Sequence, residues 1–300
     1  MSHTDRNVFR LAPALCAAAI FLTATAIAAQ KTSTAPRSTL GARAVVLPTT
    51  AELIAKGPKV AVETAAEVLG LVRGAQRSTT AVNTMELVGS GTMADHAADG
   101  TWREYKVTRF TEGLDFVIPA ERLDMERIGP NGSRQRQFHV VSGKQAWDEE
   151  KPGTNGTPVA GAADDRRRQI WLTAQGAMWG ALRALMGEGS VQLANEAGNL
   201  AISYSLNGEP MRLVLNSALL PAKVQLRAHS AAYGDTIFEA SYSQYKDFEG
   251  YLFPCPTHMT YRLGSRTIRD VTITNCVINP YVIFPLPANM KSAATNSGRS

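Results

Sequence analysis

Residues 166–187 read RRRQIWLTAQGAMWGALRALMG, an apolar segment that begins with three arginines and contains two tryptophans. From Ile170 to Met186 it offers 17 residues, whereas a transmembrane helix needs about 20 that are predominantly apolar. Polar residues and two glycines interrupt the run, so we expect no membrane span here. A helix that is apolar almost all round is typical of a protein interior, and the segment therefore predicts an internal helix.

Small and bulky side chains separate on this helix. The small stripe runs through Thr173, Gly176, Gly180, Arg183 and Gly187. Each tryptophan can bury about 150 to 250 Å², worth up to roughly 4 to 6 kcal/mol, so apolar groups must cover both. The bulky side chains are the candidate ligand-binding face: Trp171, Leu172, Met178, Trp179, Leu182, Leu185 and Met186.

Two environments fit this face, a packed core or the lid of an apolar pocket. Met178 and Met186 favour the pocket because methionine adapts to irregular apolar partners. The preceding loop, EKPGTNGTPVAGAADD at 150–165, is long and glycine-rich enough to let a lid move. Thr173 could also cap a second helix that begins at Ala174, so the segment is one helix or two.

Short alternating segments surround the helical one. Five precede it and six follow, separated mostly by short turns and with no helix between neighbours. This spacing excludes a parallel sheet and predicts a mainly β (α+β) fold, an antiparallel meander of about eleven strands. So many strands cannot stay flat, and we expect a curled half-barrel whose concave face is covered by helices at 58–72 and about 162–187.

The N-terminal residues predict an exported protein. Residues 1–29 resemble a secretory signal peptide, with Cys16 inside its apolar run, and residues 30–49 read as a flexible leader. We expect the half-barrel domain at 50–287, with Gly57 and Pro58 breaking its first helix, and a disordered tail at 288–300. Localisation is then periplasmic, with no transmembrane span after signal removal.

The mature chain gives no reason to expect a nucleic-acid partner. Removing Asp5, Arg6 and Arg10 from the 31 basic and 26 acidic residues leaves 29 and 25, a net charge of +4. The basic residues are scattered apart from Arg166, Arg167 and Arg168. We expect a monomer.

Two cysteines remain after the signal peptide, and export favours a Cys255–Cys276 disulfide. A turn centred on Ser265 and Arg266 places the two cysteines opposite each other but pairs Met259 with Thr272. A shift of one residue pairs Met259 with Ile273 on an apolar face instead. The two demands conflict, and a bulge near Pro254 and Pro256 would reconcile them.

Motifs for chemistry are absent. The histidines expected in the mature chain, His96, His139, His229 and His258, lack metal-ligand spacing, and we place His139 and His258 on strand faces. Ser243 to Lys246 matches S-x-x-K but leaves a strand rather than starting a helix, and GSGT at 89–92 lacks a third glycine. For Glu149 and Glu150 we expect solvation. The sequence predicts no enzyme: no catalytic residue, metal ion or cofactor.

The stretches QAWDEE, RQIWLTAQG, YSQYKDFEGYLFP and VTITNCVINP, within roughly residues 50–287, resemble the LolA/LppX-like half-barrel superfamily of bacterial envelope lipoprotein carriers and lipid binders. Members of that superfamily hold acyl chains between a concave sheet and helices across its mouth. The resemblance implies the same arrangement here. No binding residue can be transferred individually, since these stretches are structural signatures.

Two hypotheses of different classes follow. The first is a periplasmic binding or carrier protein for an apolar small molecule or lipid, with the acyl chains of a lipoprotein as one candidate. The alternative is an envelope interaction or sensing module with the same fold and a filled core. A hydrolase with a cryptic site is a third hypothesis, which we favour least.

Overall fold

The computed structural model describes residues 46–72, 81–96, 99–230, 233–250 and 253–291, all within one compact unit, Val46–Ser300. The expected signal peptide, most of the expected leader and residues 292–300 lie outside the described residues. Within the described ranges no helix is long and apolar enough to cross a membrane.

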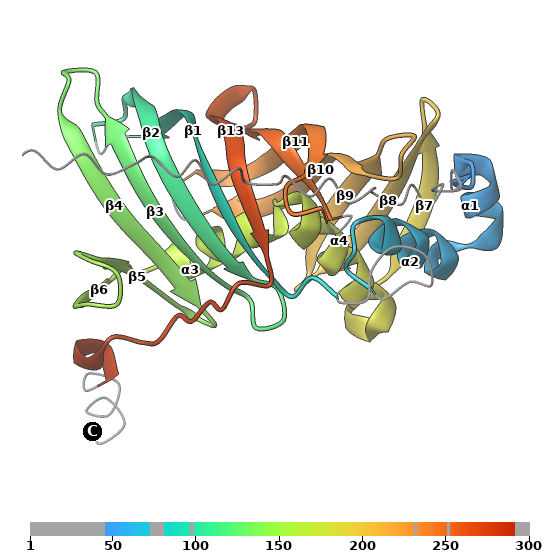
Figure 1. Ribbon diagram of the computed structural model, residues 1–300, viewed down its shortest axis with the longest axis horizontal. Helices are drawn as coiled ribbons and strands as arrows, with labels where there is room; N and C mark the ends of the chain where they lie inside the picture. The colour runs from blue at the N-terminus through green and yellow to red at the C-terminus, as the bar shows by residue number, and fades with distance from the viewer. Residues whose placement is uncertain (1–45, 73–80, 97–98, 231–232, 251–252, 292–300) are drawn as a thin grey trace, which may run out of the picture. The chain divides into compact units, whose positions relative to one another are not determined.

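Thirteen antiparallel strands form one sheet, in the order β6-β5-β4-β3-β2-β1-β13-β12-β11-β10-β9-β8-β7 (Figure 1). Their bounds are β1 Thr84–His96, β2 Trp102–Asp115, β3 Ala120–Ile128, β4 Arg134–Ser142, β5 Gln145–Glu149, β6 Gly156–Pro158, β7 Val191–Glu196, β8 Asn199–Leu206, β9 Glu209–Leu215, β10 Pro221–Ser230, β11 Gly234–Asp247, β12 Pro254–Leu263 and β13 Arg266–Ile278. The predicted half-barrel class is confirmed. All eleven expected strands are present. The sequence did not predict β6 and β7, because neither short segment carries a clear apolar alternation of its own.

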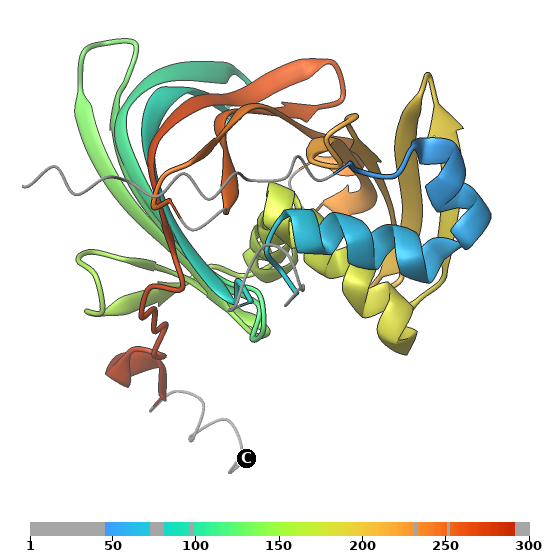
Figure 2. The same cartoon turned by 45° about the vertical axis from the view of Figure 1, so that its right-hand side comes forward.

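The two halves of the meander join through β1 and β13, where Leu87 pairs with Cys276 across 189 positions of chain. Figure 2 shows the resulting sheet curled around its concave face. The register shifts on both sides of Gly89, once against β13 and once against β2, and these irregularities sharpen the curl. A Cβ at Gly89 would lie 2.3 Å from the Thr272 carbonyl oxygen and 2.8 Å from the Phe110 ring, so the bend requires glycine there.

Two helices precede the sheet, α1 Thr50–Lys56 and α2 Pro58–Val68. Thr49 and Glu52 cap each other at the start of α1, and Gly57, at φ +88°, ends it, as expected. α2 then packs against α4 on the open side of the curled sheet (Figure 2).

The segment that first suggested one long helix forms two, α3 Ala162–Trp171 and α4 Ala174–Arg183, followed by a π-helical turn at Ala184–Glu188. Thr173 makes the division. Its hydroxyl accepts a hydrogen bond from the Gly176 N–H at 3.0 Å and donates to the Ile170 carbonyl at 2.7 Å. The second of the two sequence alternatives is therefore correct.

The cysteine pair is disulfide-bonded as predicted, but both predicted hairpin registers are wrong. Met259 pairs with Val271. The two-residue turn is centred on Gly264 and Ser265, one residue earlier than expected, and a bulge then shifts the pairing by one residue. The bulge lies at Tyr261 rather than beside the prolines. Val271 gives Met259 an apolar partner, and the disulfide then joins strand residues that are not register partners.

The chain after β13 continues past β2 and β3 towards β6 (Figure 1). Residues 288–291, where we expected a disordered tail, form a helical turn. The Asn289 side chain donates to the Gly156 carbonyl at 2.7 Å and accepts from the Gly156 N–H at 3.1 Å. These two bonds anchor the end of the described chain to β6.

Candidate functional site

A cavity of about 170 Å³ lies between α3 and the concave face of the sheet. Its apolar wall comes from five strands, α3 and a turn: Met93, Ala94, Leu123, Met125, Leu172, Tyr233, Phe238, Tyr261 and Ile268. Its polar groups are Asp95, His139, Asp165, Gln169, Glu239, Arg262 and Arg269. An apolar wall with few polar groups is the general pattern of a small-molecule site.

Strand alternation positions this wall. On β3, Leu123 and Met125 point inward and are buried, whereas Asp124 between them binds Arg136 on the opposite face, at 2.7 Å. Phe238 on β11 and Tyr261 on β12 reach the cavity by the same rule from the far side of the half-barrel. Ordinary β geometry therefore places side chains more than 100 positions apart around one cavity.

Charged contacts hold α3 across the mouth. Arg166 donates to the Trp147 carbonyl at 2.7 Å and to the Asp148 carboxylate at 2.5 Å, which ties α3 to β5. Arg168 donates from Nε to Glu209 at 2.9 Å, which ties the same helix to β9. α3 thus bridges the two sides of the half-barrel through its arginines.

α4 is held differently, by burial. Met178 is fully buried, and the Tyr204 hydroxyl donates to the Ala177 carbonyl at 2.6 Å. Trp179 donates from its ring N–H to the Val82 carbonyl at 3.0 Å. The small stripe permits this approach, since a Cβ at Gly180 would lie 2.9 Å from the Tyr204 ring. α4 is therefore part of the packed core.

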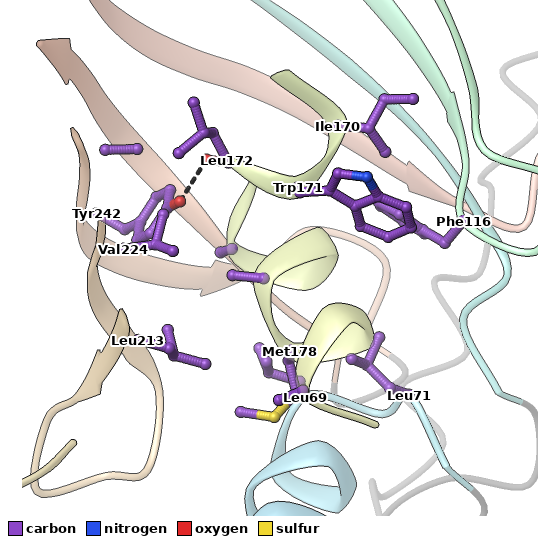
Figure 3. Packing of buried hydrophobic residues seen from close by; sticks show 14 of the residues in the cluster. Leu69, Leu71, Phe116, Ile170, Trp171, Leu172, Met178, Leu213, Val224 and Tyr242 are labelled. Atoms are coloured by element: carbon purple, nitrogen blue, oxygen red, sulfur yellow. Dashed lines mark hydrogen bonds between the residues drawn. The ribbon is translucent and has the colours of Figure 1, made fainter. Parts of the chain in front are cut away.

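Of the seven residues expected on the ligand-binding face, only Leu172 lines the cavity. Trp171, Met178 and Leu182 are buried among other core side chains, and Figure 3 shows Met178 beside Leu69 and Leu71. Three are less covered: Trp179 and Leu185 are half-buried, and Met186 is 69% exposed. The structure thus buries Trp171, Met178 and Leu182 together in the core, whereas Met186, at the C-terminal end of the segment, is exposed to solvent.

Sequence reasoning missed most of the cavity wall. Leu123 and Met125 lie at inward positions of an expected strand, so alternation identifies them as buried. It does not show which strands curl beneath α3, because that depends on pairing between distant segments. Their assignment to one cavity with Phe238 needed the tertiary structure.

Ion pairs and a neutral imidazole form the polar side of the cavity. Arg127 binds Asp95 and lies 3.9 Å from the centre of the Tyr105 ring. Burial and the nearby Arg166 guanidinium lower the pKa of His139 to about 4. His139 is therefore uncharged at neutral pH, and both it and His258 lie on strands, as expected.

A larger groove of about 420 Å³ lies over the opposite face of β8, β9 and β10. Ser203, Arg212 and Gln225 line it, and Arg212 donates to the Ser203 hydroxyl at 3.2 Å. Because this groove is open and its sheet face is polar, the smaller cavity beneath α3 suits an apolar ligand better.

Glu149 corrects a sequence expectation. Its carboxylate is buried rather than solvated, and it accepts hydrogen bonds from Trp147 at 2.9 Å and Arg122 at 3.1 Å. Glu150, its neighbour, is exposed. The carboxylate of Glu149 is thus bound within the fold rather than placed for acid-base chemistry.

One arrangement bears on the hydrolase hypothesis. Ser243 lies 3.4 Å from His258 Nδ1, and His258 Nε2 lies 2.8 Å from Asp270. The three side chains are exposed or half-exposed, and they line none of the cavities described above. Within the described residues no group of three or more His, Cys, Asp or Glu side chains is placed to hold a metal ion.

Comparisons with known proteins give likenesses among solved structures alone. No protein-family model matches the chain, and no curated protein matches it. Among solved structures, a LolA superfamily protein from Nitrosomonas europaea is similar at 12% identity and a TM-score of 0.36, covering 76% of this chain and 96% of that chain.

Proposed function

We propose that this protein is an exported binding or carrier protein, and that it takes an apolar ligand, a lipid or the acyl chains of a lipoprotein, beneath α3. The observation that carries the proposal is the apolar cavity of about 170 Å³ between α3 and the concave sheet. Ligand pockets usually measure about 300 to 1,000 Å³, so an acyl chain would enter only if the cavity enlarges.

The contacts of α3 make this helix the movable wall. Residues 162–167 of α3 are exposed or half-exposed, and Arg166 and the buried Arg168 hold the helix to the sheet through charged groups. Water can replace partners of this kind when α3 moves away. The apolar side chains of α4, such as Met178, have no such replacement, so α4 stays in place.

Mass analysis of organic extracts from freshly purified protein tests the proposal directly, because a co-purified lipid would also identify the ligand class. Delipidated protein should then bind an uncharged fluorescent acyl ester. Met125→Trp, which adds bulk at the cavity wall, should weaken binding at least tenfold. Val60→Trp is the matched control, since Val60 is 39% exposed on α2.

The carrier hypothesis fails if the extracts contain no lipid and the acyl ester binds neither wild type nor the control. Export is tested separately: the mature chain should begin near residue 30 in the periplasmic fraction. A full-length N-terminus in the cytoplasmic fraction would contradict it.

A second candidate is an envelope interaction or sensing module with a filled core. The complete burial of Met178 and the small volume of the cavity favour it. This candidate predicts that the purified protein carries no lipid, and that an envelope protein is retained on it in pull-downs from membrane extracts.

A further inference from the structure

Two carboxylates are buried in the concave floor next to the cavity. Glu112 on β2 is 0% exposed and Glu121 on β3 is 3% exposed. Leu123, which lines the cavity, is the register partner of Glu112 and lies two residues beyond Glu121 on the same face. The pair therefore adjoins the proposed ligand site.

Several polar atoms of this floor have no hydrogen-bond partner among the described residues. Within the described residues, neither carboxylate oxygen of Glu112 has a hydrogen-bond partner, and neither do Oε2 of Glu121 or the Tyr261 hydroxyl. Arg269 brings a cation within 3.6 Å of Glu112, beyond hydrogen-bond distance. A buried acceptor without a donor costs about 1 to 3 kcal/mol, and more when it is charged.

A proton on one of the two carboxylates would supply a donor between them. Two ionised carboxylates only accept, so a hydrogen bond between Glu112 and Glu121 requires that one of them is protonated. Burial, and then the charge of Glu112, raises the pKa of Glu121 well above its ordinary value. The guanidiniums of Arg269 and Arg166 act in the opposite direction without offsetting the rise.

The groups that face the pair come from four further elements. Tyr261 on β12 and Arg269 on β13 lie beside it, and Arg166 approaches from α3. On β4, His139 is the register partner of Leu123 and is uncharged at neutral pH.

We propose that Glu112 and Glu121 share one bound proton in the closed protein at neutral pH, and that opening of α3 releases it. The second half of this inference rests on the proposed function. Opening α3 would admit water to the cavity and to the carboxylates beside it, which favours their ionisation. By linkage, a rise in pH then favours the open form and weakens ligand retention.

Unfolding measurements test the proton without any ligand. Glu121→Gln keeps the size of the side chain and cannot ionise. We compare the unfolding equilibrium constant of wild type with that of the variant. Above about pH 4.5 their ratio should rise up to tenfold per pH unit, because Glu121 ionises in the unfolded chain but stays protonated in the folded protein. Below that pH the ratio should be constant. Glu126→Gln is the control. Glu126 lies on the same strand with its side chain 44% exposed, so this variant should show no such rise.

A wild-type measurement guards against a variant that does not fold. At pH 8, calorimetry in buffers of different ionisation enthalpy should show release of one proton on unfolding. Release of no proton would overturn the proposal, as would a ratio that is constant with pH.

The coupling to α3 needs a ligand that does not titrate. For an uncharged fluorescent acyl ester, the affinity of wild type should fall up to tenfold per pH unit above about pH 4.5, the ordinary carboxyl value that Glu121 regains in the open form, and it should level off above the raised pKa of Glu121 in the closed form. The affinity of Glu121→Gln should stay constant. Equal pH dependence in both proteins would overturn the coupling. If the ester binds neither protein at any pH, the proposed function and the coupling fail, while the unfolding data still decide the shared proton.

Discussion

Tyr242 offers a sensitive probe of the junction between α3 and α4. Its hydroxyl donates to the carbonyl of Leu172, the cavity-lining residue between the two helices (Figure 3). Both residues are buried, and within the described chain no other group donates to this carbonyl. Tyr242→Phe should therefore leave a buried carbonyl without a partner, at a cost of about 1 to 3 kcal/mol.

Tyr204→Phe is the matched control, because it removes the same kind of bond from the same core. The Tyr204 hydroxyl donates to the carbonyl of Ala177, which lies inside α4. That carbonyl also accepts the backbone N–H of Ala181 by the i to i−4 pattern of the helix. It keeps a partner in the variant, so we expect a cost of only about 0.5 to 1.5 kcal/mol.

Urea unfolding followed by tryptophan fluorescence measures both free energies, with m-values to check that the transitions stay comparable. Hydrogen exchange adds a local readout: amides of α3 should exchange faster in Tyr242→Phe than in Tyr204→Phe. A cost for Tyr204→Phe equal to or above that of Tyr242→Phe would refute the reasoning, since it would mean that the junction does not depend on one donor.

Three further changes test other parts of the structure. Replacing Cys255 and Cys276 by serine should lower the free energy of unfolding by about 3 kcal/mol, given their separation of 21 residues, and two free thiols in unreduced wild type would contradict the disulfide. Gly176→Ala should cost about 1 to 3 kcal/mol or more in urea unfolding, because its Cβ would lie 1.9 Å from the Ile170 carbonyl oxygen; an unchanged midpoint would show that the α3–α4 corner relaxes freely. A fluorophosphonate probe should leave Ser243 unlabelled, since this side chain lines none of the cavities described above; stoichiometric labelling would revive the hydrolase hypothesis.

Local features of the fold could be read from the sequence because they depend on neighbouring residues. Alternation identified eleven strands, and the break after the first helix could be read from two adjacent residues, Gly57 and Pro58. Thr173 indicated a possible second helix for the same reason, although the sequence could not choose between one helix and two.

The candidate site was less predictable. Bulk and hydropathy correctly placed Trp171, Met178 and Leu182 in an apolar environment, but they gave the same signal for core and lid. Leu172 lines the cavity only because α3 ends there and the chain turns into α4. Whether a buried side chain contacts another side chain or lines a cavity depends on the element packed against it. The hydrophobic periodicity of a sequence predicts burial but not that neighbour.

By itself, the sequence determined that this chain forms an antiparallel meander with an internal helical segment, since periodicity and capping act over a few residues. Only the tertiary structure decided that β1 pairs with β13, which of the thirteen strands lie beneath α3, and that Glu112 and Glu121 are both buried on adjacent strands. The physical reason is distance along the chain: Leu87 and Cys276 become neighbours through the closure of the whole sheet.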